Sequence, residues 1–252
     1  MKPVGALELL RAAHPSEPAL DIALSHGLLA DVAAGRRAPC LRLFRPGATV
    51  AFGRLDALRA GFAGACRVAR ELGYTPVLRS VGGHAAVFDE RCVVVEYVVH
   101  ARDATAGLTA RFDDQARRVR DALAALGADA RIGRLSREYC PGDHSVNVGG
   151  RVKVVGVAQR IVRHGALTSA VVACSGGPEL RAAIGALYAE LGLDFDPATA
   201  GALDELLPGA TVEAVAASVR DAYAADHRIE AREPGAALLA AARALAPRHR
   251  VP

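Results

Sequence analysis

Adjacent glycines at positions 149 and 150 separate two runs of apolar residues and constrain the fold more than any other feature of the chain. A two-residue hairpin turn of type I′ needs positive φ at both central positions, which glycine adopts without steric cost. The segment therefore predicts two antiparallel strands joined by a tight turn. The expected pairs are Val148 with Arg151 and Val146 with Lys153. A fold for this chain must accommodate antiparallel pairing here.

Hydrophobic periodicity places other elements around this hairpin. Helical spacing of apolar residues covers 19–35, 56–72, 107–126 and about 178–191, with Pro178 in the first turn of the last stretch. Short strands are expected at 41–44, 49–52, 77–79 and 166–174. The nearly continuous β-branched run 92–99 predicts a central buried strand. From residue 197 the chain is alanine-rich, with a helix expected to start near Thr211, whose side chain is a good N-cap.

This order of elements predicts an α+β fold, a mixed and largely antiparallel sheet flanked by helices, with a helical C-terminal tail. Strict alternation of strand and helix is missing, so a dinucleotide-binding fold is not expected. Ser80–Ala85 is not a GxGxxG fingerprint, and no GxxxxGK[ST] segment occurs.

Composition excludes several classes of function. The net charge is +4, aromatic residues make up 4% and tryptophan is absent, so we expect neither a nucleic-acid partner nor stacking on single strands. No long uncharged apolar run predicts a membrane span, and the N-terminus lacks a signal-peptide core, so a cytoplasmic protein is expected. The five cysteines show no CxxC spacing, which argues against a disulfide framework and a metal site.

Cys140 differs from the other cysteines because it lies in a loop, between Tyr139 and Pro141-Gly142. A nearby cation favours the reactive thiolate of such a residue, and His144 and Lys153 are both candidates for that cation. The alternative is an unreactive loop cysteine. From the sequence alone, a reactive and an unreactive Cys140 are about equally supported.

Lys153 lies in the second strand of the hairpin. Alternation puts Lys153, Val155, Val157 and Gln159 on one face of that strand and Val152, Val154, Gly156 and Ala158 on the other. The lysine either points into a pocket beside Gly156 or lies on the solvent side of an edge strand, where it would oppose aggregation.

A second glycine pair, Gly82-Gly83, follows Arg79 between two expected strands. Adjacent glycines let the backbone approach a ligand closely, and Arg79 could hold a carboxylate or phosphate at the rim. An ordinary glycine-rich connection with a surface arginine is the other interpretation, and in isolation the more common one.

Together these segments resemble the lipoate–protein ligase and octanoyltransferase family, which has the biotin/lipoate protein ligase catalytic fold. Arg79–Val87 is similar to its Arg-Arg-x-Ser/Thr-Gly-Gly-Gly-x-Val motif, and Gly149–Gln159 to its Asn-Gly-Arg-Lys-Ile-Ser/Ala-Gly-Ser-Ala-Gln motif. The resemblance extends to the first helix, to Leu41–Gly53 and to the tail after Leu203. It implies a catalytic domain over 1–200 with a helical extension over 201–252 packed on it.

The resemblance implies that Cys140 and Lys153 are catalytic and that no metal is bound by the protein in the transferase branch. It also implies a substrate-binding set: Arg79, Val81, Gly82, Gly83, His84, Ala85, Gly156, Val157, Ala158 and Gln159. Lys153 would contact the acyl carbonyl and favour the Cys140 thiolate. Two departures from the family pattern stand out. His84 replaces the third glycine, and Ser169-Ala170 stands where many members have His-Gly.

The family contains two mechanisms. Its short cysteine-dependent branch, which this chain resembles more, moves an octanoyl or lipoyl group from a donor such as octanoyl acyl carrier protein, through a cysteine thioester, to a lysine of a lipoyl domain. Glycine-cleavage H protein and 2-oxoacid dehydrogenase E2 are acceptors of this type. The ligase branch activates lipoate with ATP and Mg. A non-catalytic binder of lipoate, biotin or another acyl cofactor is the third hypothesis.

Overall fold

The computed structural model describes residues 5–251 as an α+β fold built on a large mixed sheet. Its strands are β1 (Ala6–Leu10), β2 (Cys40–Phe44), β3 (Thr49–Phe52), β4 (Thr75–Leu78), β5 (Ala86–Phe88), β6 (Cys92–His100), β7 (Ala130–Ile132), β8 (Val146–Val148), β9 (Val152–Val162), β10 (Gly165–Ala173) and β11 (Arg228–Ala231). The α-helices are α1 (Pro18–Ala33), α2 (Phe62–Glu71), α3 (Leu108–Ala125), α4 (Gly177–Leu191), α5 (Val212–Ala224) and α6 (Ala236–Leu245). Short 3-10 helices are η1 (Asp56–Leu58), η2 (Pro197–Thr199), η3 (Leu203–Glu205) and η4 (Ala246–His249).

The large sheet has the strand order β11-β1-β2-β6-β10-β9-β8-β7. The β11-β1-β2 edge is parallel, whereas β2, β6, β10, β9, β8 and β7 pair antiparallel in turn. The expected fold class is therefore confirmed. The β-branched strand β6 lies between β2 and β10, as its sequence predicted, because a strand covered on both faces can carry apolar residues at every position.

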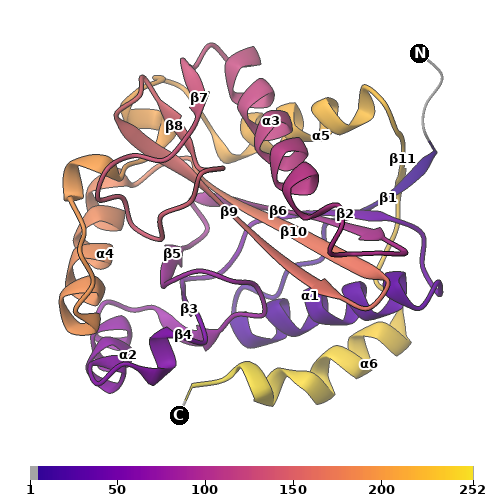
Figure 1. Ribbon diagram of the computed structural model, residues 1–252, viewed down its shortest axis with the longest axis horizontal. Helices are drawn as coiled ribbons and strands as arrows, with labels where there is room; N and C mark the ends of the chain where they lie inside the picture. Colours follow the sequence, from indigo (N-terminus) through magenta and orange to yellow (C-terminus); the bar gives the residue numbers. More distant parts are fainter. Residues whose placement is uncertain (1–4, 252) are drawn as a thin grey trace.

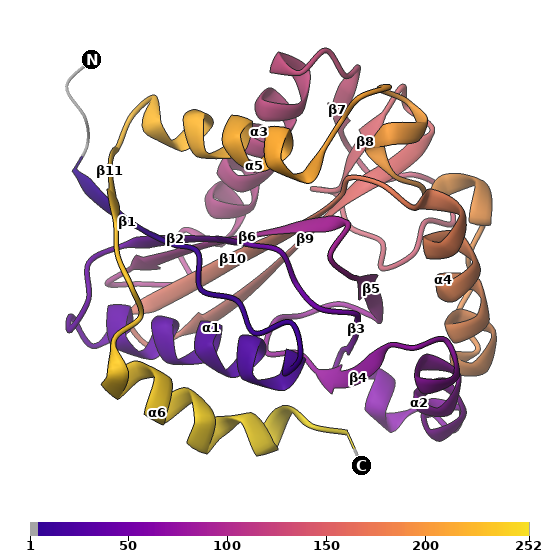
Figure 2. The ribbon, with the colours of Figure 1, turned by 180° about the vertical axis from the view of Figure 1, so that it is seen from behind.

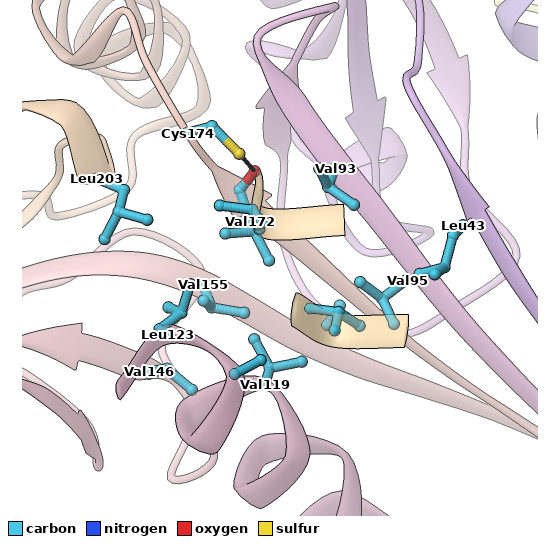
Figure 3. Close-up of a cluster of buried hydrophobic side chains, with 14 of the residues drawn as sticks. Leu43, Val93, Val95, Val119, Leu123, Val146, Val155, Val172, Cys174 and Leu203 are labelled. Carbon is cyan, nitrogen blue, oxygen red and sulfur yellow. Dashed lines mark hydrogen bonds between the residues drawn. The ribbon is translucent and has the colours of Figure 1, made fainter. Parts of the chain in front are cut away.

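Helices cover both faces of this sheet. α1 and α6 lie on one face, and α3 and α5 lie on the other (Figures 1 and 2). The core between the sheet and α3/α5 is drawn in Figure 3, where Val93, Val95, Val155 and Val172 of the strands meet Val119 and Leu123 of α3. In the described part of the chain no helix is both long and apolar enough to cross a membrane.

A second, three-stranded sheet has the order β4-β3-β5. Its apolar residues pack with those of α2 and α4 in a separate core that includes Phe52, Ala65 and Ile184. This small sheet lies beside the large one (Figure 2), and the segments that leave its strands β4 and β5 reach the cavity described below.

The hairpin prediction is correct in its turn residues and wrong in its register. Gly149 and Gly150 have φ of 64° and 69°, but Val148 pairs with Val152, and Asn147 with Lys153. Between Asn147 and Val146 the register shifts, so that Val146 faces Val155 and Val154 is an extra residue. This β-bulge reverses the alternation of β9 at one point.

Four short strands were not predicted from the sequence. β1, β5, β7 and β11 have five, three, three and four residues, too few to show a clear period. The C-terminal tail is consequently not wholly helical, because β11 adds a parallel edge strand to the sheet. Two smaller predictions are confirmed: Pro178 lies in the first turn of α4, and Thr211 caps α5 by accepting a hydrogen bond from the Ala214 N–H.

Candidate active site

A cavity that is partly open to solvent lies between α1, the small sheet and the large sheet. Its sheet wall consists of residues paired across three strands: Gly156–Val171–Val94 and Ala158–Ser169–Glu96. Its other lining residues include Pro18, Asp21, Ile22, Ser25, Phe44, Ala51, Arg79, Ser80, Val81, Val87, Phe88, Tyr139, Cys140 and Val157. The wall is mostly apolar, and glycine and alanine on β9 leave room for a ligand.

Cys140 lies at the wall of this cavity in a strained main-chain conformation, with φ of 41°. Its N–H donates to the Tyr188 hydroxyl (2.7 Å), and that hydroxyl donates to the Ala85 carbonyl (3.2 Å). The sulfur accepts hydrogen bonds from the His84 N–H (3.2 Å) and from the Arg79 guanidinium (3.4 Å). Two donors, one of them cationic, therefore face the sulfur where negative charge would develop.

Lys153 is brought to the same side of the sheet by the bulge in β9. Since Val155 faces the α3 core, the extra residue places Lys153 on the face of Gly156, and a Cβ added to Gly156 would lie 3.8 Å from Lys153 Cε. The prediction that Lys153 shares a face with Val155 is thus wrong. The ammonium is buried and donates to Glu138 Oε1 (3.1 Å) and to the carbonyls of Tyr139 and Cys140 (2.9 Å each). Burial lowers its pKa, and Glu138 opposes that shift.

The direct contact expected between the lysine and the cysteine thiol is not formed. Lys153 holds the carbonyl of Cys140, whereas Arg79 is the cation at the sulfur. The ring of His144, the other candidate, has its Nε2 3.0 Å from Asp113 Oδ1 and stacks on Phe112. Arg79 itself is buried and not at the rim, because its guanidinium also bonds the His84 carbonyl.

Glu138 organises the loop and was not singled out from the sequence. Its buried carboxylate accepts from the Leu135 N–H (3.0 Å), the Gly142 N–H (3.0 Å) and the Ser145 hydroxyl (2.7 Å), besides Lys153. Nothing in the residues around Glu138 distinguishes it from a solvated glutamate. Tyr188 was not singled out from the sequence either, because it lies in α4, far along the chain from Cys140.

The glycine loop packs directly against Cys140. Gly83 has φ of 95°, and a Cβ there would lie 2.7 Å from the Cys140 sulfur and 2.5 Å from Arg79 Nη2. A Cβ on Gly82 would meet no atom within 4 Å. The main chain at Gly83 therefore lies too close to Cys140 and Arg79 to carry a side chain. Neither glycine lines the cavity; Val81 does, while Ala85 is buried and accepts from Tyr188.

His84 binds a carboxylate that the sequence did not indicate. Its Nδ1 lies 2.7 Å from Asp56 Oδ1, and the fully buried Asp56 accepts from the Gly53 N–H through Oδ2 (2.8 Å). The third-glycine position thus carries a histidine that contacts Cys140 through its main chain and Asp56 through its ring.

Gln159 does not face the cavity. Its amide donates to the Thr168 hydroxyl (3.1 Å) and its oxygen accepts from Arg111 of α3 (3.4 Å). The reason is strand alternation, which directs Ala158 into the cavity and Gln159 to the opposite face. Gly156, Val157 and Ala158 border the cavity, and the side chain of Val157 packs against the core on the other face of the sheet.

The cavity has a polar region at α1. Arg42 donates to Asp21 (2.5 Å) and Glu96 (3.4 Å), and the Ser25 hydroxyl donates to Glu96 (2.6 Å). Burial raises the pKa of Glu96. Ser169, the second departure from the motif, lies beside Glu96 on this wall. Among residues 5–251 no cluster of three metal-ligating side chains occurs.

Comparisons with known proteins agree with one another. The model of the lipoyl protein ligase A/B catalytic domain matches residues 17–224. An octanoyl-[GcvH]:protein N-octanoyltransferase of Geobacillus kaustophilus is 27% identical over 195 residues, which cover 73% of this chain and 69% of that protein. A lipoate-protein ligase A bound with ATP has the same fold (TM-score 0.75, 18% identity, 96% and 94% of the two chains). So does a bipartite lipoate protein ligase from Thermoplasma acidophilum, studied with its E2 lipoyl domain (TM-score 0.71, 17% identity, 96% and 92%).

Proposed function

Because the chain belongs to the lipoyl protein ligase A/B catalytic domain family, we propose that it moves an octanoyl or lipoyl group through a Cys140 thioester to a lysine of a lipoyl acceptor domain. The observation that carries the cysteine mechanism is the environment of the sulfur. It lies at the wall of a mostly apolar cavity with Arg79 and a main-chain N–H as hydrogen-bond donors. The relatives named octanoyltransferases support the same reaction class.

In the first half-reaction, Cys140 Sγ attacks the acyl carbonyl of the donor. A carbon–sulfur bond forms and the bond from the carbonyl carbon to the donor breaks, so that the donor leaves with its electron pair. Arg79 stabilises the thiolate before attack, and the His84 N–H, which contacts the sulfur, is the proposed donor for the oxyanion. In the second half-reaction, a lysine amine attacks the thioester and Cys140 leaves as a thiolate.

Lys153 acts in this proposal by holding the nucleophile in place. All three of its N–H groups are directed at acceptors, and one of these is the carbonyl of Cys140 itself. Its ammonium also places positive charge behind the loop, where a cation favours a thiolate. The role of Lys153 is therefore electrostatic and positional.

The cavity is the proposed site of the acyl chain. Val81, Gly156 and Ala158 would contact its methylene groups, since they line the same cavity as Cys140. Burial of apolar chain against such a wall stabilises the complex by roughly 0.8 kcal/mol per CH₂.

The names of the relatives identify GcvH as the protein that carries the octanoyl group in their reaction. We propose a lipoyl domain of the H-protein or E2 type as acceptor, and either octanoyl-GcvH or octanoyl acyl carrier protein as donor. The transferase reaction needs no cofactor.

Intact-mass measurement after incubation with each octanoyl donor tests the proposal. We expect an adduct one octanoyl group heavier than the protein, lost in Cys140→Ala and discharged by an acceptor lipoyl domain. No adduct with either donor would refute the cysteine mechanism.

A ligase reaction is the second candidate, favoured by the fold shared with an ATP-bound ligase. It would require ATP and Mg, and it predicts lipoate-dependent release of pyrophosphate that survives Cys140→Ala. Tight lipoate binding with neither adduct nor pyrophosphate would instead identify a non-catalytic binder.

A further inference from the structure

The ring of His84 is held by a carboxylate and keeps one nitrogen open. Nδ1 lies 2.7 Å from Asp56 Oδ1, the Asp56 side chain is fully buried, and the His84 side chain is 28% exposed. A neutral imidazole that donates Nδ1–H to a carboxylate carries its lone pair on Nε2. Within residues 5–251, Nε2 of His84 has no hydrogen-bond partner.

This imidazole is tied to the nucleophile through its own main chain. The His84 N–H donates to Cys140 Sγ (3.2 Å), and the His84 carbonyl accepts from Arg79, which also contacts the sulfur. The anchor of the ring is equally fixed, because a Cβ on Gly53 would collide with the carbonyl of Gly83. The segment just before the 3-10 helix η1 therefore packs against the glycine loop, and the Gly53 N–H in it donates to Asp56.

Other polar side chains near the sulfur are unsuited to accept a proton. All three N–H groups of the Lys153 ammonium are already donated to acceptors. The guanidinium of Arg79 has no lone pair with which to accept a proton. The Tyr188 hydroxyl is bonded to Cys140 and Ala85, and burial raises its pKa well above the ordinary value. Of the described groups that contact the Cys140 sulfur or main chain, His84 alone has a ring nitrogen without a hydrogen-bond partner.

We propose that His84, oriented by Asp56, transfers the proton of the lysine amine during acyl exchange. This inference rests on the thioester mechanism proposed above. As the amine nitrogen attacks the thioester carbonyl, the carbon–nitrogen bond forms and the carbon–sulfur bond breaks. The electron pair of that bond goes to Cys140 Sγ beside Arg79, and the ammonium proton goes to His84 Nε2.

The same group serves the reverse step when the donor is an octanoyl-lysine amide. Cys140 then attacks the amide, and the leaving amine takes its proton from His84. A thioester donor differs, because its leaving group departs as a thiolate and needs no proton. His84 should therefore matter for every step that makes or breaks a lysine amide and not for acylation by a thioester.

His84→Asn tests this separation, because asparagine can keep a donor near the Nδ1 position while removing Nε2. Cys140 is first acylated with octanoyl-pantetheine, and the acyl-enzyme is then mixed with purified GcvH at pH 5 to 8. We expect wild-type rates of acylation in the variant, and transfer slowed by about 10²-fold or more. The titratable and charged groups that contact His84 are Asp56, Arg79 and the Cys140 thiol.

The pH profile distinguishes proton transfer from a structural role. Transfer by the wild type should rise with pH both because the attacking amine must be deprotonated and because His84 accepts a proton only as the neutral imidazole. In His84→Asn the residual transfer should keep only the rise that comes from deprotonation of the attacking lysine amine, and Asp56→Asn should alter the part due to the imidazole while leaving thioester acylation intact. Asp56→Asn tests the proposal independently should His84→Asn fail to fold.

His144→Asn is the matched control, since His144 also pairs with an aspartate, Asp113. It should transfer at the wild-type rate with the wild-type pH profile. Rapid transfer with an unchanged profile in both His84→Asn and Asp56→Asn would overturn the role of His84 while leaving the thioester mechanism intact. Absence of any acyl-enzyme in the wild type would reject both.

Discussion

Cys140 differs from the other four cysteines in its access to solvent and in its neighbours. Burial raises the pKa of Cys40 and of Cys92 to about 12, and it also raises the pKa values of Cys66 and Cys174. A thiol with a raised pKa stays protonated to higher pH, and the thiol form is a poor nucleophile. At pH 8 only about one part in 10⁴ of Cys40 or Cys92 would be thiolate.

Iodoacetamide at pH 8 should therefore modify the native protein once, at Cys140. Peptide mass mapping locates the label, and Cys140→Ala should remain unlabelled on the same time scale. Labelling of Cys66 as fast as Cys140 would contradict the prediction. In denaturant all five cysteines should react, which shows that the selectivity depends on the fold.

Glu138→Ala should destabilise the protein more than removal of a surface carboxylate. It leaves the buried Lys153 ammonium without its anion and frees two loop N–H groups, so a loss of about 3–5 kcal/mol in unfolding free energy is expected. Urea denaturation measures the change. Glu179→Ala, which breaks a largely exposed ion pair with Arg91, should cost at most about 1 kcal/mol. Equal losses in the two variants would be inconsistent with the proposed role of Glu138.

At the scale of elements, the glycine loop supplies a sharper pair of variants. Gly83→Ala puts a methyl group against the Cys140 sulfur and Arg79. Alanine is also strained at the φ of 95° that Gly83 adopts. The methyl group added by Gly82→Ala would have no atom within 4 Å. We expect Gly83→Ala to abolish acyl-enzyme formation, measured by intact mass, while Gly82→Ala retains it. Circular dichroism should show both variants folded; full acylation of Gly83→Ala would show that the loop adapts.

The sequence predicted the elements that carry a long or strong period, and these include α1, β6, α3 and the hairpin. It placed Cys140, Lys153 and the glycine loop near one another because they belong to motifs. It could not predict the bulge in β9, since an extra residue in a ladder depends on the partner strand and leaves no pattern of its own. Asp56 and Tyr188 were missed because their contacts with the site join distant parts of the chain.

At the scale of the whole molecule, the C-terminal helix α6 supports α1, which lines the cavity. Leu238 is buried in the core shared with Leu24 and Leu28, and it packs against Gly27. Leu238→Ala should lower the unfolding free energy by about 2–5 kcal/mol. Leu55→Ala, at a side chain that is 68% exposed, should change it by less than about 0.5 kcal/mol. Thermal unfolding checks both, and a negligible effect at Leu238 would mean that α6 unfolds separately.

The parallel pairing of β1 with β11 has a consequence for how the protein is made. Ala6 lies opposite Arg228, so a strand from the start of the chain is held between β2 and a strand from near its end. Loops of this length close slowly, because their entropy is lost before the contact is gained. On a ribosome, β1 therefore has one free edge until β11 has been synthesised. Completion of this edge of the sheet comes late in folding, and chaperones that cover exposed strand edges would act before it.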